Sequence, residues 1–325
     1  CFTANPNNSR AIGDDQGYDE FFELWTEVPR TVSRAPGYLT QRALEWLARF
    51  DDSRPLHLQL HFVPPHAPYE PAPEFDIFTD PAYDGWCDGA QRTLRRIDRG
   101  YRAADDADLA QITALYDGNL RAADDSVAQV LDALKSRERW RDTVVLVTSD
   151  HGEAFFEHQR LMHNNTVYDE MLRVPFILRM PGGHLPDGVD LDRFATLADL
   201  MPTLLAAASV RPPATVDGTD LLQPVNENDM RYVIARTAHH YPLRALRTPR
   251  WKLVLTSSGQ AQLFDMTSDP GEHENVGFEN LSTLVGLGQI FTRRLAVPPS
   301  LTGARSTSEA PLADQEMLKA LGYME

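Results

Sequence analysis

Cysteine is scarce in this chain of 325 residues, which contains Cys1 and Cys87 and no other. Two cysteines cannot form the disulfide framework that stabilises small secreted domains, and neither stands at the spacing of a metal-binding cysteine cluster. We therefore expect a hydrophobic core, formed from the 42% of residues that are hydrophobic, to stabilise the fold. The cysteines indicate no redox compartment.

The chain also lacks long hydrophobic runs and has fewer basic than acidic residues. No stretch approaches the roughly 18 consecutive apolar residues of a membrane-spanning helix, so we expect no membrane span in this chain. Lys and Arg number 31 against 47 Asp and Glu, which gives a formal net charge of −16. Such a charge repels phosphate backbones and anionic lipid, so a nucleic-acid partner is not expected, whereas acidic sites can attract cations.

The sequence opens with "CFTANPNNSR", without an initiator Met or a recognisable signal peptide. We expect the chain to be a carboxyl-terminal fragment of a longer protein. Its localisation is left open: periplasmic or secreted if the missing amino terminus carries a signal peptide, and cytoplasmic otherwise. The oligomeric state is equally open.

Hydrophobic spacing predicts an α/β fold for the first half of the chain. Apolar residues recur at steps of three and four over residues 39–50 and 108–136, which predicts two helices. The alternating run at 54–62 predicts a strand that ends in a proline-rich loop carrying His66. The Val-rich run at 143–150 is typical of a buried strand in a mostly parallel sheet sandwiched by helices.

The second half changes in composition after a helix predicted at 196–209. Residues 210–229 are rich in Pro, Asp and Asn, which is typical of a linker. Strands are predicted in this half at 173–182, 231–238, 243–248, 250–257 and 260–266. We expect the last four strands to form a small antiparallel sheet, accompanied by a helix at 314–323. The sequence therefore predicts two domains, 1–212 and 213–325.

Asp150 and His151 stand at the carboxyl end of the strand predicted at 143–150. Open α/β sheets bind ligands at this end of their strands, and a carboxylate beside an imidazole supplies two ligands for a divalent cation. Gly152 allows the backbone to pass close by. An aspartate that caps the next helix, followed by a surface histidine, would have the same sequence. The motif alone therefore leaves both interpretations open.

Two further histidines occupy loops that can present an imidazole. His66 lies in the proline-stiffened loop, which holds a side chain in a fixed geometry at little entropic cost. His163 lies in a polar loop before a helix-like run. Each is equally consistent with an ordinary loop histidine, and only the combination of all these features points to a site.

Several segments resemble, in order and spacing, the sulfatase family of the alkaline phosphatase superfamily. They include "LHFVPPHAPYEP", "TVVLVTSDHGE", "TVYDEMLRVPFI" and "QLFDMTSDP", and with weaker matches they cover nearly the whole chain. The resemblance implies an alkaline-phosphatase-like fold and a type I sulfatase mechanism. In that mechanism a formylglycine made from Cys or Ser attacks sulfur while a calcium ion holds the sulfate oxygens. The implied substrate is a small-molecule or carbohydrate sulfate ester.

The same resemblance implies roles for particular residues. Asp150 and His151 would be half of the shell of a divalent metal, for which Ca²⁺ is expected. His66 matches the histidine of "PHxPY", which is expected to bind the sulfate ester or to protonate the leaving oxygen. His163 precedes "TVYDE", where relatives place Lys or His, and would be a second cationic partner for sulfate.

The chain departs from the family pattern in two places. The nucleophile motif Cys/Ser-x-Pro-x-Arg is absent, because Cys1 is followed by Phe-Thr-Ala-Asn and Cys87 by Asp-Gly-Ala-Gln. We therefore expect the nucleophile and the first acidic metal ligands to lie upstream, and the fragment by itself to be inactive. Pro64 also replaces the Asp that often stands two positions before the loop histidine.

Two other functions remain open at this point. A phosphodiesterase or phosphonate monoester hydrolase of the same superfamily shares the Asp-His-Gly strand end. A non-catalytic binding protein that has lost its nucleophile is the other alternative. The sequence upstream of Cys1 separates them, since a Cys-x-Pro-x-Arg or Ser-x-Pro-x-Arg motif there supports a sulfatase.

Overall fold

A computed structural model of the protein describes residues 1–29, 31, 34–163, 166–213, 215–225, 231–237, 243–256 and 260–295. The chain divides into two compact units, whose described residues lie at 1–140 and at 141–295. This division falls inside the catalytic domain predicted at 1–212. The domain boundary predicted at residue 212 therefore stays a prediction.

The first unit contains a three-stranded parallel sheet. Its central strand β1 (Phe2–Thr3) lies between β2 (Phe22–Glu23) and β3 (Leu60–His61). The parallel pairing agrees with the predicted fold class. The strand predicted at 54–62 is much shorter than expected, because β1 offers only two residues with which Leu60 and His61 can pair.

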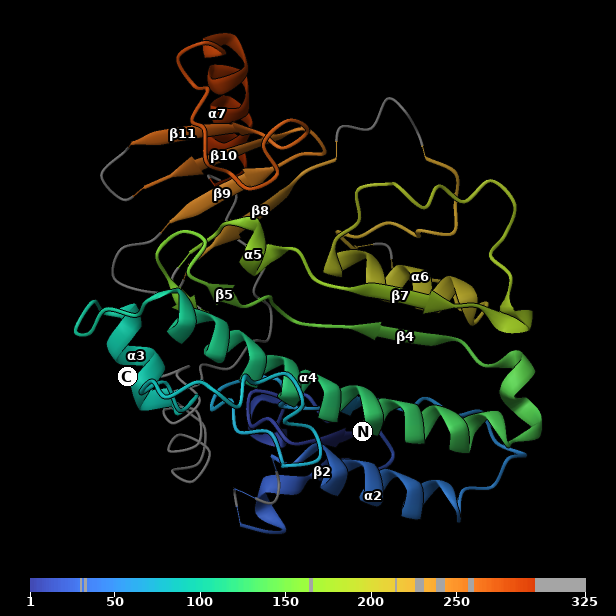
Figure 1. Ribbon diagram of the computed structural model, residues 1–325. Coiled ribbons are helices and arrows are strands. Elements are labelled where there is room, and N and C mark those ends of the chain that lie inside the picture. Colours follow the sequence, from blue (N-terminus) through green and yellow to red (C-terminus); the bar gives the residue numbers. More distant parts are fainter. Residues whose placement is uncertain are drawn as a thin grey trace. The chain divides into compact units, whose positions relative to one another are not determined.

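One helix of the first unit packs against this sheet, and a second helix packs against the first. The helices predicted at 39–50 and 108–136 are confirmed as α2 (Pro36–Leu47) and α4 (Asp106–Lys135), which lie side by side in Figure 1. Between them in sequence lies α3 (Gln91–Asp98). The core that joins α2 to the sheet consists of Phe2, Ala4, Leu24, Leu39, Ala43 and Val63.

The second unit begins with a two-stranded antiparallel sheet. Strand β4 (Val145–Thr148) pairs with β7 (Phe176–Arg179) in the antiparallel direction. The parallel neighbour expected for the strand predicted at 143–150 is therefore not found in this pair. A parallel pair requires a long crossover that covers the sheet, whereas the chain here turns back through a hairpin and a short helix.

That hairpin and helix lie next to the predicted site. Strand β5 (Ala154–Phe155) pairs antiparallel with β6 (Leu161–Met162), and α5 (Asp169–Leu172) follows. The helix predicted at 196–209 is confirmed as α6 (Leu200–Ala207), preceded by a 3₁₀ turn at Leu197–Asp199.

The predicted antiparallel sheet of four strands is confirmed and has the order β11-β10-β9-β8. The strands are β8 (Val233–Arg236), β9 (Arg244–Arg247), β10 (Trp251–Leu255) and β11 (Ala261–Asp265). One face packs against α7 (Leu281–Leu295), which sequence reasoning did not predict (Figure 1). The helix predicted at 314–323 lies outside the described residues.

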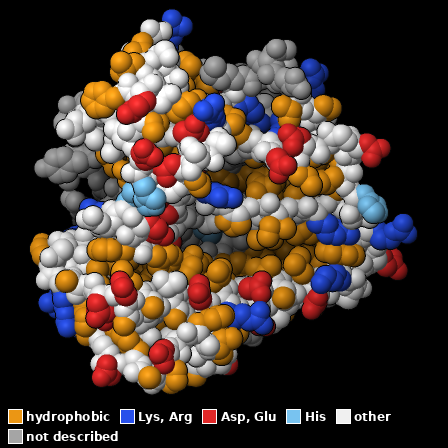
Figure 2. Space-filling view, turned by 45° about the horizontal axis from the view of Figure 1, so that its top comes forward, with side chains coloured by type: hydrophobic (Ala, Val, Ile, Leu, Met, Phe, Trp, Pro, Cys, Tyr) orange, Lys and Arg blue, Asp and Glu red, His pale blue; other side chains and the backbone are white. Residues whose placement is uncertain are grey.

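No helix among the described residues is long and apolar enough to cross a membrane. On the face drawn in Figure 2, Asp and Glu side chains are spread among hydrophobic and other side chains. The negative charge on that face is thus distributed rather than gathered in one patch.

Candidate functional site

Asp150 and His151 lie in the turn that follows β4. The carboxylate of Asp150 is largely exposed, and its Oδ1 accepts a hydrogen bond from the backbone N–H of His151 at 3.1 Å. The Nε2 of His151 lies 3.8 Å from the same oxygen. The hydroxyl of Ser149 donates to the carbonyl of His151 at 2.6 Å, which holds the turn. The turn therefore presents a carboxylate and an imidazole side by side.

Gly152 is required by the close approach of this turn to α5. Its N–H donates to the carbonyl of Met171 at 2.9 Å. A Cβ at this position would lie 2.0 Å from the carbonyl oxygen of Glu170, far inside the contact distance. Only glycine allows the chain to pass here without a shift of the helix. The position of the Asp150–His151 turn therefore depends on the position of α5.

The hairpin brings a second histidine to this turn. Because Ala154 pairs with Met162, the flanking residues Glu153 and His163 also lie opposite each other. The Nδ1 of His163 lies 3.1 Å and 3.3 Å from the two carboxylate oxygens of Glu153, and both side chains are buried. Met162 has a φ of 63°, a left-handed conformation that is disfavoured for its side chain. Strained backbone of this kind is concentrated at functional sites.

His151 and His163 meet at the turn. Their ring centroids are 4.3 Å apart and the rings are tilted by 30°. With Glu153 they form a group in which one ligand atom from each residue lies within 4.8 Å of the other two. Two ligands on opposite sides of a calcium ion are about 5 Å apart, since each contact is about 2.3–2.6 Å long. A single divalent cation can therefore contact this group.

The donor atoms of the turn and the hairpin fit a divalent cation. Carboxylate oxygens, here from Asp150 and Glu153, suit Ca²⁺ and Mg²⁺, whereas the imidazole nitrogens of His151 and His163 suit zinc and related metals. Glu153 is already paired with His163 and is 5% exposed, whereas the side chain of Asp150 is 60% exposed. Asp150 is thus the carboxylate that a cation from solvent reaches first.

His66 lies in the loop after β3, within residues 1–140. Its Nδ1 is 2.6 Å from the carbonyl of Ala67 and 3.3 Å from Nη2 of Arg34. The same Nη2 donates to the Ala67 carbonyl at 2.5 Å. The loop thus holds an imidazole beside a permanently charged guanidinium, and both groups are suited to binding an oxyanion.

Three of the four predicted site residues are brought together, namely Asp150, His151 and His163. His66 belongs to the other unit, so its convergence with the three stays a prediction. All four roles that the resemblance implies likewise stay predictions.

Sequence reasoning missed two residues that contact the predicted ones. Glu153 could have been found from a hairpin at this point, because pairing of the flanking strands places it opposite His163. Arg34 contacts His66 across 32 positions of sequence. No pattern around Arg34 indicates that contact.

Neither cysteine has the surroundings of a nucleophile. Both Cys1 and Cys87 are free and buried. Burial raises the pKa of the Cys87 thiol to about 11, so the thiol is protonated at neutral pH and unreactive. This state of Cys87 agrees with the absence of the nucleophile motif around it.

Comparison with known proteins identifies relatives. The family profile "Sulfatase" matches residues 2–210, and the profile "N-sulphoglucosamine sulphohydrolase, C-terminal" matches residues 157–285. An arylsulfatase of Clostridium perfringens is 27% identical over 284 residues, which are 79% of this chain and 58% of that protein. The chain spans about half the length of the curated relatives it matches.

Solved structures share the fold at lower identity. A protein in complex with its substrate D-glucosamine-2-N,6-O-disulfate matches with a TM-score of 0.63 and 17% identity, over 80% of this chain and 69% of that one. The phosphonate monoester hydrolase of Agrobacterium radiobacter matches with a TM-score of 0.64 and 21% identity, over 85% of this chain and 64% of that one. At such identities the likeness concerns the fold alone.

These matches define the class of fold and then the family. The solved structures share the α/β fold predicted from the sequence, and the family profile shows the sulfatase family of the alkaline phosphatase superfamily. Within that superfamily, the chain belongs to the sulfatase family. The family profile includes the β4 turn with Asp150 and His151 and the hairpin that ends at His163.

Proposed function

We propose that the protein containing this chain is a metal-dependent sulfuric ester hydrolase that acts on a small-molecule or carbohydrate sulfate ester. The observation that carries the proposal is the meeting of Asp150 and His151 with His163 at the end of β4, in a chain of the sulfatase family. We further propose that residues 1–212 belong to the catalytic domain and residues 213–325 to a smaller subdomain.

Asp150 and His151 would hold the divalent cation, for which Ca²⁺ is proposed. Such a cation, when bound, supplies Lewis acidity that stabilises charge on the oxygens of the transferring group. The exposed carboxylate of Asp150 and the net charge of −16 both favour the approach of a cation. The remaining metal ligands are proposed to come from outside this chain.

His163 and His66 would contact the sulfate ester. Glu153 contacts Nδ1 of His163 and so orients its ring, and Nε2 is the atom proposed to contact the ester. Arg34 and the Ala67 carbonyl lie on the Nδ1 side of His66, so Nε2 is again the atom proposed to bind the ester or to protonate its leaving oxygen.

The nucleophile is proposed to be a formylglycine outside this chain, derived from Cys or Ser. Neither Cys1 nor Cys87 stands in a Cys-x-Pro-x-Arg motif. The buried and protonated thiol of Cys87 supports this assignment. The 325-residue chain alone is therefore proposed to be inactive.

The test compares the whole natural protein with this chain on an aryl sulfate. The whole protein should hydrolyse the ester, lose activity in a chelator and regain it with Ca²⁺, whereas the chain should show no turnover. Asp150→Asn should lower kcat/KM by about 100-fold or more, since even residues behind metal ligands contribute 10- to 100-fold. The control Asp132→Asn, on the exposed face of α4, should have no effect. Hydrolysis that persists without metal would contradict the proposal.

A phosphonate monoester hydrolase or phosphodiesterase of the same superfamily is the second candidate, because these enzymes share the Asp-His-Gly strand end found at residues 150–152. The ratio of kcat/KM for an aryl sulfate to kcat/KM for an aryl phosphonate monoester decides between the two. A ratio above one supports the sulfatase, and a ratio well below one supports the alternative. Binding of both esters without turnover by the whole protein would indicate a non-catalytic binding protein.

A further inference from the structure

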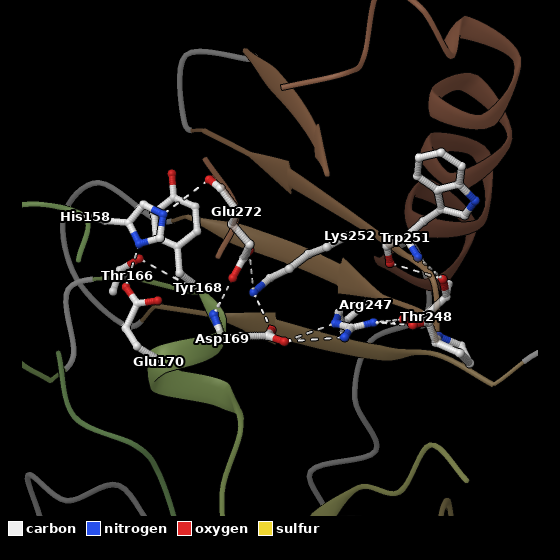
Figure 3. A network of polar contacts seen from close by, with 11 residues as sticks. His158, Thr166, Tyr168, Asp169, Glu170, Arg247, Thr248, Trp251, Lys252 and Glu272 are labelled. Carbon is white, nitrogen blue, oxygen red and sulfur yellow. Dashed lines mark hydrogen bonds and ion pairs between the residues drawn. The ribbon is translucent and has the colours of Figure 1, made fainter. Parts of the chain in front are cut away.

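A group of charged side chains lies between the four-stranded sheet and α5, and Figure 3 shows it from close by. Lys252 of β10 is completely buried, and its Nζ lies 2.7 Å from Asp169 Oδ1 and 2.8 Å from Glu272 Oε1. Arg247 of β9 lies 3.4 Å from the other oxygen of Asp169. We refer to Lys252, Asp169, Glu272 and Arg247 as the α5 charge cluster.

A lysine is an unexpected choice at this position of the sheet. Side chains alternate along β10, so Leu253 faces α7 while Lys252 and Val254 face α5. Val254 packs in an apolar cluster with Phe264, which lies opposite Lys252 in the register. An apolar residue at position 252 would avoid the cost of burying a charge, so the ion pairs require a reason other than stability.

The cluster holds the first turn of α5 through its backbone as well as its side chains. A carboxylate oxygen of Glu272 accepts a hydrogen bond from the N–H of Asp169 at 2.5 Å, at the helix end where backbone donors lack partners. Next along the chain, Glu170 lies 2.9 Å from Nδ1 of His158. The ring of His158 stacks on Tyr168 with centroids 3.7 Å apart. Three consecutive residues, from 168 to 170, are therefore each held in place.

The other end of α5 contacts the candidate metal turn. The carbonyl of Met171 accepts the hydrogen bond from Gly152, and the carbonyl oxygen of Glu170 lies 2.0 Å from the position that a Cβ of Gly152 would take. Gly152 directly follows Asp150 and His151. A continuous set of contacts thus runs from the sheet through Asp169 and α5 to the two proposed metal ligands.

We propose that the α5 charge cluster positions the turn that carries Asp150 and His151, with Lys252 as its central positioning residue. The proposal rests on the proposed function of that turn as a metal site. A buried ion pair offsets the cost of burying its charges only when its atoms keep a favourable geometry. The ion pairs therefore fix the position of α5, whereas apolar contacts alone would tolerate small shifts of the helix. Lys252 itself contacts neither metal nor substrate in this scheme.

Amide hydrogen exchange at Gly152 in the metal-free chain tests the positioning directly. In Lys252→Met, the Gly152 amide should exchange roughly tenfold faster relative to the amides of β10 and β11, which corresponds to the loss of about one hydrogen bond's net stabilisation. Lys252→Arg, which keeps the charge, should restore part of the protection. The control Arg250→Gln removes an ion pair between the exposed Arg250, which directly precedes β10, and Asp265 of β11, and should change nothing.

A purely structural role gives a different result, because it would raise exchange equally at Gly152 and in the sheet. That outcome, or unchanged exchange at Gly152, would overturn the proposal. If Lys252→Met does not fold, Glu272→Gln replaces it. This variant keeps an oxygen acceptor for the Asp169 N–H and should give a smaller increase of the same kind.

Calorimetric titration with Ca²⁺ separates this proposal from the proposed function. In the whole natural protein, Lys252→Met should bind Ca²⁺ about 10- to 100-fold more weakly than the wild type, and Arg250→Gln should bind it equally well. Unaltered affinity in a folded Lys252→Met would contradict the link to the metal site. A whole natural protein that binds no Ca²⁺ would instead contradict the metal site itself, and exchange at Gly152 would still decide the positioning role.

Discussion

The two faces of the four-stranded sheet differ in their chemistry although they come from alternate residues of the same strands. The face toward α7 is apolar and consists of Leu246, Leu253 and Leu263 packed against Leu287 and Phe291. The face toward α5 combines Val254 and Phe264 with the buried charge of Lys252. Both faces carry buried apolar residues, yet among the described residues of the sheet the completely buried charge of Lys252 lies on the α5 face alone, whereas the ion pair of Asp265 on the other face is made with the exposed Arg250.

This difference indicates that one face mainly stabilises the sheet and the other mainly fixes the position of the helix packed on it. Apolar contacts stabilise roughly in proportion to the area they bury and tolerate small rearrangements of the packed partner. A buried ion pair contributes little net stability, but removing one partner leaves the other charged and unsolvated. We infer that α7 serves mainly to stabilise the sheet, whereas α5 is held at a defined place. The predictions below test that contrast, from the largest expected effect to the smallest.

Lys252→Met should lower the free energy of unfolding by about 3–5 kcal/mol, because two buried carboxylates lose their shared partner. Urea denaturation measures the loss. The double variant Lys252→Met/Glu272→Gln should recover part of it by removing one of the unpaired charges. A decrease in the free energy of unfolding no larger than that for an exposed ion pair would contradict the view that the buried carboxylates depend on Lys252.

Leu287→Ala, on the opposite face, should lower the free energy of unfolding by about 2–5 kcal/mol through lost burial and a cavity. Its effect should be spread over the sheet, without selective exchange at Gly152. Val285→Ala, two positions earlier on α7 but 52% exposed, is the matched control and should have a much smaller effect. Selective exposure of Gly152 in Leu287→Ala would erase the contrast between the two faces.

The pH dependence of stability should reveal the buried carboxylate of Glu272. Burial raises its pKa above the ordinary value of 4.5, and Lys252 opposes that shift. The folded state therefore binds this proton more tightly, so the contribution to stability is fully present below about pH 4.5 and is lost as pH rises through the folded-state pKa. Relative to Glu272→Gln, the wild type should lose stability from pH 4.5 toward neutrality. Urea titrations of both proteins that run parallel across this range would contradict the assignment.

Arg250→Gln should leave the unfolding free energy unchanged within the error of denaturation measurements. Arg250 is 62% exposed and pairs with Asp265 at 2.8 Å, and exposed pairs are screened by water and salt. Arg250 directly precedes β10 and lies two positions before Lys252 in the sequence. A measurable loss here would mean that burial is not what distinguishes the α5 charge cluster.

Much of the fold could be read from spacing along the chain. The helices at Pro36–Leu47 and Asp106–Lys135 were predicted because apolar residues at helical spacing mark one face of each. The four strands of the antiparallel sheet were predicted from short runs separated by turn residues. Asp150 and His151 could be singled out because they follow a recognisable strand.

Other features depend on partners that spacing does not reveal. The strand predicted at 54–62 is limited to Leu60–His61 because β1 is short. Strand β4 pairs with β7 in the antiparallel direction. Helix α7 was missed although Leu284, Leu287 and Phe291 recur at helical spacing. Gly286 and Gly288 lie between them and lower the intrinsic helix propensity of the segment.

By itself the sequence determined most of the long helices and the four strands of the antiparallel sheet, because that information lies within a few residues of each position. It also determined the acidic charge and the motifs at Asp150 and His151. Only the tertiary structure decided which charges meet. Lys252 contacts Asp169 across 83 positions, and Asp169 contacts Glu272 across 103. Such contacts depend on how strands pair and which face each side chain takes, and no local pattern encodes either.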